Sequence, residues 1–525
     1  MFLLKLLTLV TFFGASFQLS SPSSSTYQAG VVEFNVGILT NRNSTTLLNE
    51  RLARYLEILD NAPSTLDIIV FPELTLNMIL TASEIPKPED EITPCDDENS
   101  EVENFIRNIS CSAKKYKRYV VINITEKSKC PDPEMIGNED PQECRPNGLN
   151  YYNTNVVFDR NGKIVSRYRK YHLFRESVDR PLKPEFSIFE TDFGVTFGQF
   201  ICFDIIFKTP ALDLVRNYNL TDFIFPALWF GELPFLTAVQ LQQNWAYANN
   251  VNMLAAGTNN VPVGSTGSGI YGGKKGAYVA EMAKGNITEL YTATIYKIKN
   301  FPEHENVTIE HNVIKHSKDE MKNLLINRDF LDFYEMEFID DINGTHYQEN
   351  DFCESEICCK IKVNFTILNS EEVPHYQYAM AFFHGNRTFQ GFADANITAC
   401  ALIACPSRNT SSCGSRNEEL ENFHTWTSIE VEIETPKKDG NIFYMPTSLD
   451  SSIMPLQPGD FDYEEIDLKN ERVRNVMKLN SHVDELLTFG IYGFDYDLDY
   501  KPENSGEKHE VFVILIAVSF VITIL

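Results

Sequence analysis

The sequence predicts a layered α/β domain followed by a smaller, disulfide-rich and β-rich lobe. From Val31 to about Lys299, short apolar runs typical of buried strands alternate with segments of helical periodicity. An Asn-Gly pair inside this alternation indicates a hairpin. Beyond about residue 300 the periodicity breaks up, whereas cysteines and short β-like runs accumulate. Alternating strands and helices are the pattern of an α/β domain, so the fold class changes along the chain.

The predicted strands are short apolar runs closed by polar or turn-forming residues. In the α/β domain these runs are 34–39, 67–71, 119–124, 195–201, 223–225 and 253–256. Residues 154–158 and 164–168 flank Asn161-Gly162, a pair that suits the tight turn of a hairpin. In the second lobe, residues 360–368 and 427–434 have the same β-like pattern.

Three segments indicate helices. The first carries its apolar residues on one helical face, at Leu48, Leu52, Tyr55, Leu56 and Leu59. A second helical stretch covers about 236–249, between two of the strands. A third helix is expected to open at 209–210, where threonine would form the cap and proline the first turn.

Composition places the bulk of the chain among folded globular proteins. Of the 525 residues, 43% are hydrophobic and 22% are charged. The formal net charge of -28 repels phosphate, so a nucleic-acid partner is not expected. The predicted organisation is a signal peptide over 1–20, the α/β domain over 30–300, the second lobe over 301–500 and a processed tail over 505–525.

Both ends carry processing signals. Lys5, an apolar run and small residues near Gly14 make the first 20 residues a secretory signal. The apolar tail from Val511 runs to the last residue and follows small residues, the layout of a glycosylphosphatidylinositol (GPI) signal with Asn504 or Ser505 as the anchor. The spacer is shorter than usual for such a signal. A single-pass helix is the alternative, but the tail is shorter than the roughly 17 residues that a spanning helix needs.

Eleven N-x-[ST] sequons follow the signal peptide, a density that fits a glycosylated secreted protein. The acceptors are Asn43, Asn108, Asn123, Asn219, Asn286, Asn306, Asn343, Asn364, Asn386, Asn396 and Asn409. Asn123 is the exception in context, since it lies within the apolar run 119–124.

The 11 cysteines fall into two even groups and one single residue. The early group is Cys95, Cys111, Cys130 and Cys144, and the late group is Cys353, Cys358, Cys359, Cys400, Cys405 and Cys413. In an oxidising compartment these groups predict two early and three late disulfides, although spacing leaves the pairing within each group open. Cys202 is left over, and an unpaired cysteine is either an inert buried thiol, an intermolecular partner or a nucleophile.

Three reactive residues lie just past predicted strand ends: Glu73, Lys170 and Cys202. The carboxyl ends of strands are where functional groups converge in α/β sheets. A thiol, a carboxylate and an ammonium group suffice for amide hydrolysis, because the base takes the thiol proton and the cation stabilises the oxyanion. Taken singly, each residue is also explained as a surface charge or a buried filler.

The remaining motifs of the sequence do not predict a cofactor or metal site. Gly267 to Gly272 fits G-x-G-x-x-G, but the strand-like run 277–282 follows where a dinucleotide site needs a helix. No H-E-x-x-H or paired C-x-x-C pattern occurs, so a metal site is not expected. The sequence around Cys202 also differs from that of papain-like proteases.

The ordered motifs resemble the Glu-Lys-Cys triad of the nitrilase superfamily. They read FPE at 71–73, YRKYHLF at 168–174 and GQFICFD at 198–204. Further runs are similar to the vanin–biotinidase branch, namely CFDIIF at 202–207, FPALW at 225–229 and GSGIY at 267–271. The resemblance covers about residues 31–271 and implies a nitrilase-type α-β-β-α sandwich with an added C-terminal domain. Leu74 departs from relatives that often carry a polar or aromatic residue there, which leaves the substrate open.

The resemblance also implies roles. Cys202 would be the nucleophile that forms a thioester, Glu73 the proton acceptor, and Lys170 the proton donor and oxyanion stabiliser. Glu176 is a further candidate acid near the site, with a surface position as the alternative. The implied protein is an extracellular, GPI-anchored amidohydrolase of small linear amides, with pantetheine as first and a biotin amide as second candidate substrate. The alternative function is that of an inactive GPI-anchored binding or adhesion glycoprotein on the same scaffold.

Overall fold

The computed structural model describes residues 19–37, 43–97, 102–130, 144–299, 307–368, 374–389, 393–437, 441–469 and 471–496. Most of the predicted signal peptide, the predicted GPI signal with Asn504 and Ser505, and the sequon at Asn306 lie outside these residues. Within the described ranges, no helix combines the length and apolar composition that crossing a bilayer requires.

The α/β lobe contains two sheets that are joined at one corner. The first sheet has the order β13-β1-β2-β3-β4-β5, with strands β13 (Glu289–Tyr296), β1 (Thr26–Asn35), β2 (Ile68–Val70), β3 (Tyr119–Lys129), β4 (Leu149–Phe158) and β5 (Ile164–Arg169). The second has the order β6-β7-β8-β10-β11-β12-β14, with β6 (Ser187–Glu190), β7 (Thr196–Gln199), β8 (Asp222–Ala227), β10 (Asn252–Asn259), β11 (Ser268–Gly272), β12 (Ala277–Glu281) and β14 (Asn312–Ile314). β1 and β10 pair where Phe34 lies beside Thr258, and β14 extends the lobe past residue 300.

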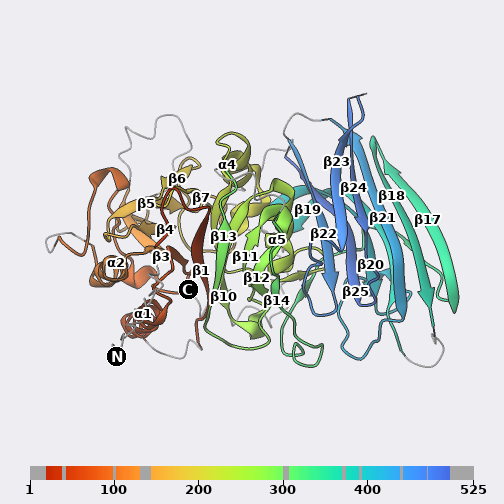
Figure 1. Cartoon of the computed structure of the whole chain (residues 1–525), viewed down its shortest axis with the longest axis horizontal. Helices are drawn as coiled ribbons and strands as arrows, with labels where there is room; N and C mark the ends of the chain where they lie inside the picture. Colours follow the sequence, from red (N-terminus) through yellow and green to blue (C-terminus); the bar gives the residue numbers. More distant parts are fainter. Residues whose placement is uncertain are drawn as a thin grey trace, which may run out of the picture.

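Alternation along the strands divides the core into layers. Val31 and Val70 of the first sheet pack with Ile224 and Leu254 of the second in one cluster, so this cluster fills the space between the sheets. The neighbouring Val32 points the other way, into a cluster with residues of α1 (Ser44–Asn61) and α2 (Asn104–Tyr116). The lobe is therefore the predicted α-β-β-α sandwich, with α1 and α2 on one outer face (Figure 1).

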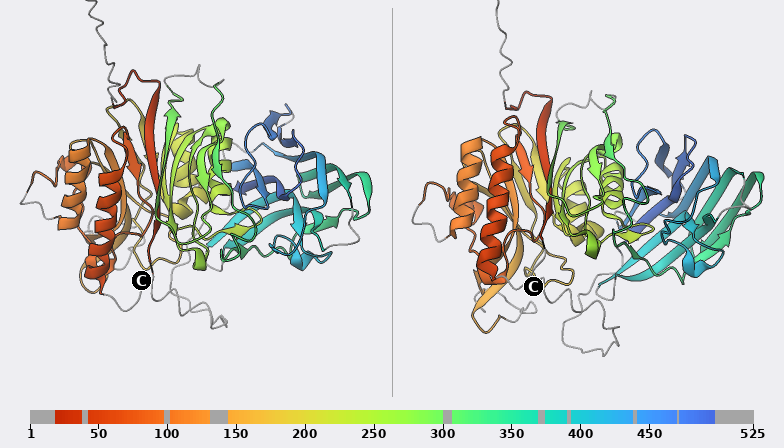
Figure 2. Two further views of the ribbon diagram at one scale, coloured as in Figure 1. Left: turned by 60° about the horizontal axis from the view of Figure 1, so that its bottom comes forward. Right: turned by 90° about the horizontal axis from the view of Figure 1, so that it is seen from below.

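On the other outer face, α5 (Ala238–Asn249) covers the second sheet together with the short α4 (Asp213–Arg216). Trp245 of α5 is fully buried and packs on Phe200 and Phe223. The same helix contacts the second lobe, where Gln240 Nε2 donates to Thr447 Oγ1 at 2.9 Å. α5 is thus buried between the second sheet and the C-terminal lobe (Figure 2).

The C-terminal lobe is a sandwich of two five-stranded antiparallel sheets. One has the order β16-β19-β20-β25-β22, with β16 (Glu335–Phe338), β19 (Gln377–Phe389), β20 (Ala393–Cys405), β25 (Leu486–Asp495) and β22 (Ile442–Asp450). The other has the order β17-β18-β21-β24-β23, with β17 (Gly344–Glu354), β18 (Ile357–Ile367), β21 (His424–Pro436), β24 (Arg472–Leu479) and β23 (Phe461–Asp467). The prediction of a β-rich second lobe is confirmed.

Short elements complete the chain. β9 (Glu232–Leu233) pairs in parallel with β15 (Asn327–Arg328). The remaining helical turns within the described residues are η1 (Ile79–Thr81), η2 (Pro88–Asp90), η3 (Cys202–Ile206), η4 (Lys208–Leu212), η5 (Val261–Val263), η6 (Gly273–Lys275) and η8 (Thr410–Ser412).

One local prediction was wrong. The strand expected at 34–39 lies earlier: β1 runs from Thr26, opposite Tyr296, to Asn35, and residues 38–39 lie outside the described residues. The helix expected to open at Thr209-Pro210 does open there. Thr209 has the extended conformation of a cap residue, and the chain is helical from Pro210 through the rest of η4 and through α4 to Arg216.

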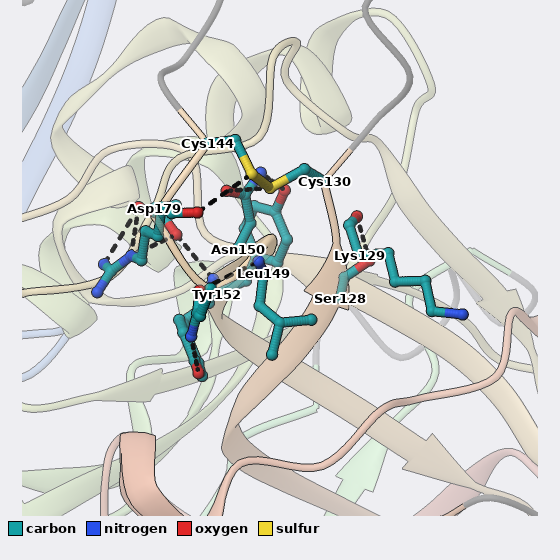
Figure 3. Close-up of a disulfide and its surroundings, with 11 residues drawn as sticks. Ser128, Lys129, Cys130, Cys144, Leu149, Asn150, Tyr152 and Asp179 are labelled. Atoms are coloured by element: carbon teal, nitrogen blue, oxygen red, sulfur yellow. Dashed lines mark hydrogen bonds and ion pairs between the residues drawn. A yellow bond between two sulfur atoms is a disulfide. The ribbon is translucent and has the colours of Figure 1, made fainter.

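The cysteine prediction is confirmed. The five disulfides are Cys95–Cys111, Cys130–Cys144, Cys353–Cys358, Cys359–Cys400 and Cys405–Cys413, and Cys202 is free. Cys359–Cys400 joins β18 to β20 and so ties together the two sheets of the C-terminal lobe. Cys130–Cys144 holds the chain between β3 and β4, beside Asn150 of β4 (Figure 3).

Candidate active site

Glu73 follows β2 directly and is 1% exposed, which corrects the surface alternative for this residue. Its Oε1 accepts hydrogen bonds from Lys170 Nζ at 2.7 Å and from Asn153 Nδ2 at 2.8 Å. Its Oε2 accepts one from the backbone N of Leu228 at 2.6 Å. Both carboxylate oxygens are therefore held, and the side chain has a fixed direction.

Three buried asparagines of β3 and β4 support this carboxylate. Asn123 Nδ2 donates to Asn153 Oδ1 at 2.7 Å and to Asn155 Oδ1 at 3.0 Å. Asn123 Oδ1 accepts from the backbone N of Leu74, which has a positive φ of 55°. The network fixes the turn after Glu73 and orients the Asn153 amide toward it.

The structure excludes one predicted glycosylation site. Asn123 is 0% exposed and its amide is fully engaged, so the folded protein leaves no space for a glycan there. The other described acceptors are exposed or half-buried: Asn43, Asn108, Asn219, Asn286, Asn343, Asn364, Asn386, Asn396 and Asn409.

Lys170 ends the hairpin and is buried between two carboxylates. Its Nζ donates to Glu73 and to Glu176 Oε1, and Asn153 Nδ2 donates to Glu176 Oε2 at 2.7 Å. Burial opposes the charged ammonium, but Glu176 and Glu73 more than offset this and raise the pKa of Lys170 well above its usual value. Lys170 is therefore a permanent cation at this site.

Glu176 is buried in the site, so the surface alternative was wrong for this residue as well. Its side chain is 6% exposed, and burial raises its pKa, with Glu73 adding to the effect and Lys170 opposing it. Glu73, Lys170 and Glu176 form one unit, the catalytic-site cluster, with two carboxylates around one cation.

Cys202 begins η3 just after β7 and is 5% exposed. It has a positive φ of 47°, a conformation that non-glycine residues rarely adopt and that is found at functional sites. Its Sγ lies 3.5 Å from the carbonyl oxygen of Leu228. Burial, followed by the charge of Glu73, raises the pKa of Cys202 well above its usual value, so the resting group is a neutral thiol beside a base.

Asp204 holds the turn that carries Cys202. Its carboxylate accepts hydrogen bonds from the backbone N of Ile201 at 3.1 Å, from the backbone N of His172 at 2.9 Å and from Tyr168 Oη at 2.7 Å. Burial raises the pKa of Asp204 to about 6. The contact couples the Cys202 turn to the segment after Lys170, so the two halves of the site keep one geometry.

The thiol opens into a mostly apolar pocket. Six apolar residues of the α/β lobe line it, namely Phe174, Phe203, Leu228, Trp229, Phe230 and Leu236. Glu232 contributes a carboxylate, and Phe389 reaches the pocket from β19 of the C-terminal lobe. Such a pocket fits a small neutral molecule whose orientation is set by few polar groups.

The three residues that the sequence singled out thus converge on one site. The arrangement can attack a carbonyl carbon through sulfur, move a proton through Glu73 and stabilise negative charge through Lys170. Among the described residues, no group of three or more His, Cys, Asp or Glu side chains is arranged to hold a metal ion. Sequence reasoning missed Asn153, which holds Glu73, and also Glu232 and Phe389, which line the pocket, because only the fold brings these residues to the site.

The chain matches two known protein families and several known proteins. Residues 35–265 match the carbon-nitrogen hydrolase family and residues 324–499 match the vanin C-terminal domain. The chain is 39% identical over 507 residues to vanin-like protein 1 of Drosophila melanogaster, covering 92% of this chain and 88% of the relative. It is 32% identical over 422 residues to a pantetheinase of Homo sapiens, covering 75% and 77%.

A structural comparison finds Nit3 of Saccharomyces cerevisiae, a member of branch 10 of the nitrilase superfamily. The identity is 19% and the TM-score is 0.40, covering 56% of this chain and 99% of Nit3.

Proposed function

Because the chain belongs to the vanin branch of the nitrilase superfamily, we propose that it hydrolyses a small linear amide through a thioester on Cys202. The chain is a carbon–nitrogen hydrolase for amides other than peptide bonds. The observation that carries the proposal is the contact of Glu73 and Lys170, 2.7 Å apart, beside the single free thiol.

In the first half-reaction, the Cys202 proton passes to Glu73 while Sγ bonds to the amide carbonyl carbon. The high pKa of the thiol favours transfer during the attack over a preformed thiolate. Lys170 stabilises the oxyanion of the tetrahedral intermediate. The C–N bond then breaks, the amine leaves with the proton held by Glu73, and a thioester remains.

In the second half-reaction, water attacks the thioester and gives a proton to Glu73. The C–S bond breaks, the carboxylic acid leaves, and Glu73 returns the proton to Sγ. One carboxylate serves both steps, which fits the fixed position given to Glu73 by three hydrogen bonds. Glu176 does not move protons in this scheme; it holds Lys170 and balances its charge.

Pantetheine is the first candidate substrate, and a biotin amide such as biocytin is the second. Relatives at 32% and 30% identity are named pantetheinase and pantetheine hydrolase. The mostly apolar lining of the pocket suits a neutral amide. A panel of pantetheine, biocytin and simple acyl amides, assayed with purified ectodomain and with Cys202→Ala as control, tests the assignment. Hydrolysis of none of them would favour the alternative of an inactive binding glycoprotein.

The proposed location is the extracellular face of the cell membrane, with a GPI anchor at Asn504 or Ser505. Five disulfides support an oxidising compartment. Phosphatidylinositol-specific phospholipase C should release the protein from intact cells into the medium. Retention after effective enzyme treatment would favour a transmembrane anchor.

A further inference from the structure

The pocket has one acidic wall residue that the proposed reaction does not use. Glu232 lies on β9, lines the same pocket as Cys202 and is 8% exposed. Its backbone is fixed by a reciprocal pair of hydrogen bonds with Leu236, at 3.1 and 2.9 Å. A buried carboxylate facing an apolar pocket is costly unless it has partners, so its partners indicate its role.

The partner of Glu232 comes from the other lobe. Arg387 of β19 donates from Nη2 to Glu232 Oε1 and from Nε to Asp329 Oδ1 at 2.8 Å. The guanidinium also lies over the ring of Phe389, 4.1 Å from its centroid. We call Glu232, Arg387 and Asp329 the interlobe cluster. One strand of the C-terminal lobe therefore supplies both an apolar wall of the pocket and the cation that holds its carboxylate.

The interlobe cluster leaves an acceptor unused. Two carboxylates surround one guanidinium, so the cluster carries a net negative charge. Arg387 occupies Oε1 of Glu232, and no hydrogen bond to Oε2 occurs within the described part of the chain. Burial, followed by the opposing effect of Arg387 and the repulsion of Asp329, brings the pKa of Glu232 to about 6. At neutral pH this wall residue is thus a carboxylate with one oxygen able to accept a hydrogen bond.

We propose that Glu232 is a specificity-determining residue that accepts a hydrogen bond from a hydroxyl group of the substrate. Arg387 is its positioning residue, so the C-terminal lobe takes part in substrate recognition. The inference rests on the proposed function, since it concerns the substrate of that site. It assigns the substrate class as neutral amides that carry a hydrogen-bond donor, and it disfavours substrates with a carboxylate at that place.

The test uses a matched pair of substrates: pantetheine and its analogue with both hydroxyl groups replaced by hydrogen. For the wild-type protein we expect kcat/KM to be about 10- to 100-fold higher for pantetheine, the range for a hydrogen bond to a charged group. In Glu232→Leu this preference should fall to near unity, because the hydroxyl groups of pantetheine lose their acceptor. Glu434→Gln is the control, because Glu434 is ion-paired to Arg472 in the C-terminal lobe and does not line the pocket.

The variant Arg387→Lys tests whether Arg387 positions Glu232 or only supports the fold. It keeps the charge but loses the fork, so KM for pantetheine should rise and the preference for pantetheine over the dideoxy analogue should fall. If Glu232→Leu fails to fold, the wild-type comparison still decides: equal kcat/KM for the two substrates overturns the inference. An unchanged preference in folded Glu232→Leu also overturns it, while leaving the proposed amide hydrolysis intact. Hydrolysis of neither substrate by the wild type overturns the proposed substrate and this inference together.

Discussion

Two buried ion clusters in the described part of the molecule have the same arrangement of charge, with one cation between two carboxylates. In the catalytic-site cluster, Lys170 lies between Glu73 and Glu176; in the interlobe cluster, Arg387 lies between Glu232 and Asp329. The first is saturated, because Asn153 and the Leu228 amide occupy the remaining carboxylate oxygens. In the second, Glu232 lines the pocket, and its Oε2 accepts no hydrogen bond from the described residues.

This difference in hydrogen bonding gives the two clusters different roles: the first acts in the reaction, and the second in substrate recognition. A saturated cluster fixes a base and a cation relative to a nucleophile, and preorganisation of this kind lowers the barrier of the reaction. An unsaturated cluster has an acceptor left for a ligand, and a buried acceptor without a ligand donor is costly, so it discriminates between substrates. Lysine suits the first role as a compact charge, and arginine suits the second as a fork that bridges two carboxylates.

The largest expected effect comes from substitution of Cys202, whose thiol lies beside the catalytic-site cluster. Cys202→Ala should lower kcat/KM by at least about 10⁴, because no other group in the site can form the thioester. Both clusters should persist, so thermal melts should match the wild type. Turnover at the wild-type rate would show that Cys202 is not the nucleophile.

The carboxylates of the two clusters should differ sharply. Glu73→Gln cannot accept the thiol proton, and loss of a general base lowers kcat by about 10² to 10⁴. Glu232→Gln keeps an acceptor oxygen and should change kcat/KM for pantetheine by about 10-fold or less. Steady-state kinetics on the two variants measure both values. Equal losses in kcat would mean that the two clusters do not have separate roles.

Replacing Lys170 by arginine and Arg387 by lysine tests further whether the two clusters have separate roles. Lys170→Arg should lower kcat by about 10² to 10³, as expected for loss of an oxyanion stabiliser, because the guanidinium is too broad for the space between Glu73 and Glu176. Arg387→Lys should leave kcat nearly unchanged and act through KM. Circular dichroism of both variants checks the fold, and a large loss of kcat in Arg387→Lys alone would reverse the assignment.

The last expected effect is on stability, in the C-terminal lobe, and is confined to acid. Burial lowers the pKa of His424, in β21 of the C-terminal lobe, to about 4. The unfolded chain binds a proton at this residue below about pH 6.5, whereas the folded chain does so only near pH 4, so the free energy of unfolding falls as pH drops between these values. The loss amounts to about 3 kcal/mol. His424→Phe should flatten the pH dependence of denaturant unfolding between pH 6.5 and 4, whereas an unchanged slope would contradict the assignment.

Much of this architecture could be predicted from the sequence, because its signals are local. Apolar runs, the helical face of Leu48 to Leu59 and the Asn161-Gly162 turn predict the α/β lobe, and the even cysteine groups predict five disulfides. Glu73, Lys170 and Cys202 could be found because each stands in an ordered motif. The bounds of β1 could not, since they depend on its pairing with β13, which lies far along the chain.

No local sequence pattern predicts the interlobe cluster. Arg387 and Glu232 are 155 positions apart, and only the packing of β19 against the α/β lobe brings them together. The support of Glu73 by Asn123 and Asn153 was hidden for the same reason, and the sequon at Asn123 suggested a surface position that the structure contradicts. Long-range contacts between polar residues leave no periodicity in the sequence.

The most direct test of the central claim is to label the protein with iodoacetamide under non-reducing conditions and to follow modification and activity together. Cys202 is the one free cysteine of the chain, so peptide mapping should find a single carbamidomethyl group there. Activity should fall in proportion to the modified fraction, and an amide substrate should slow both processes. Full modification of Cys202 with activity retained would contradict the thioester mechanism.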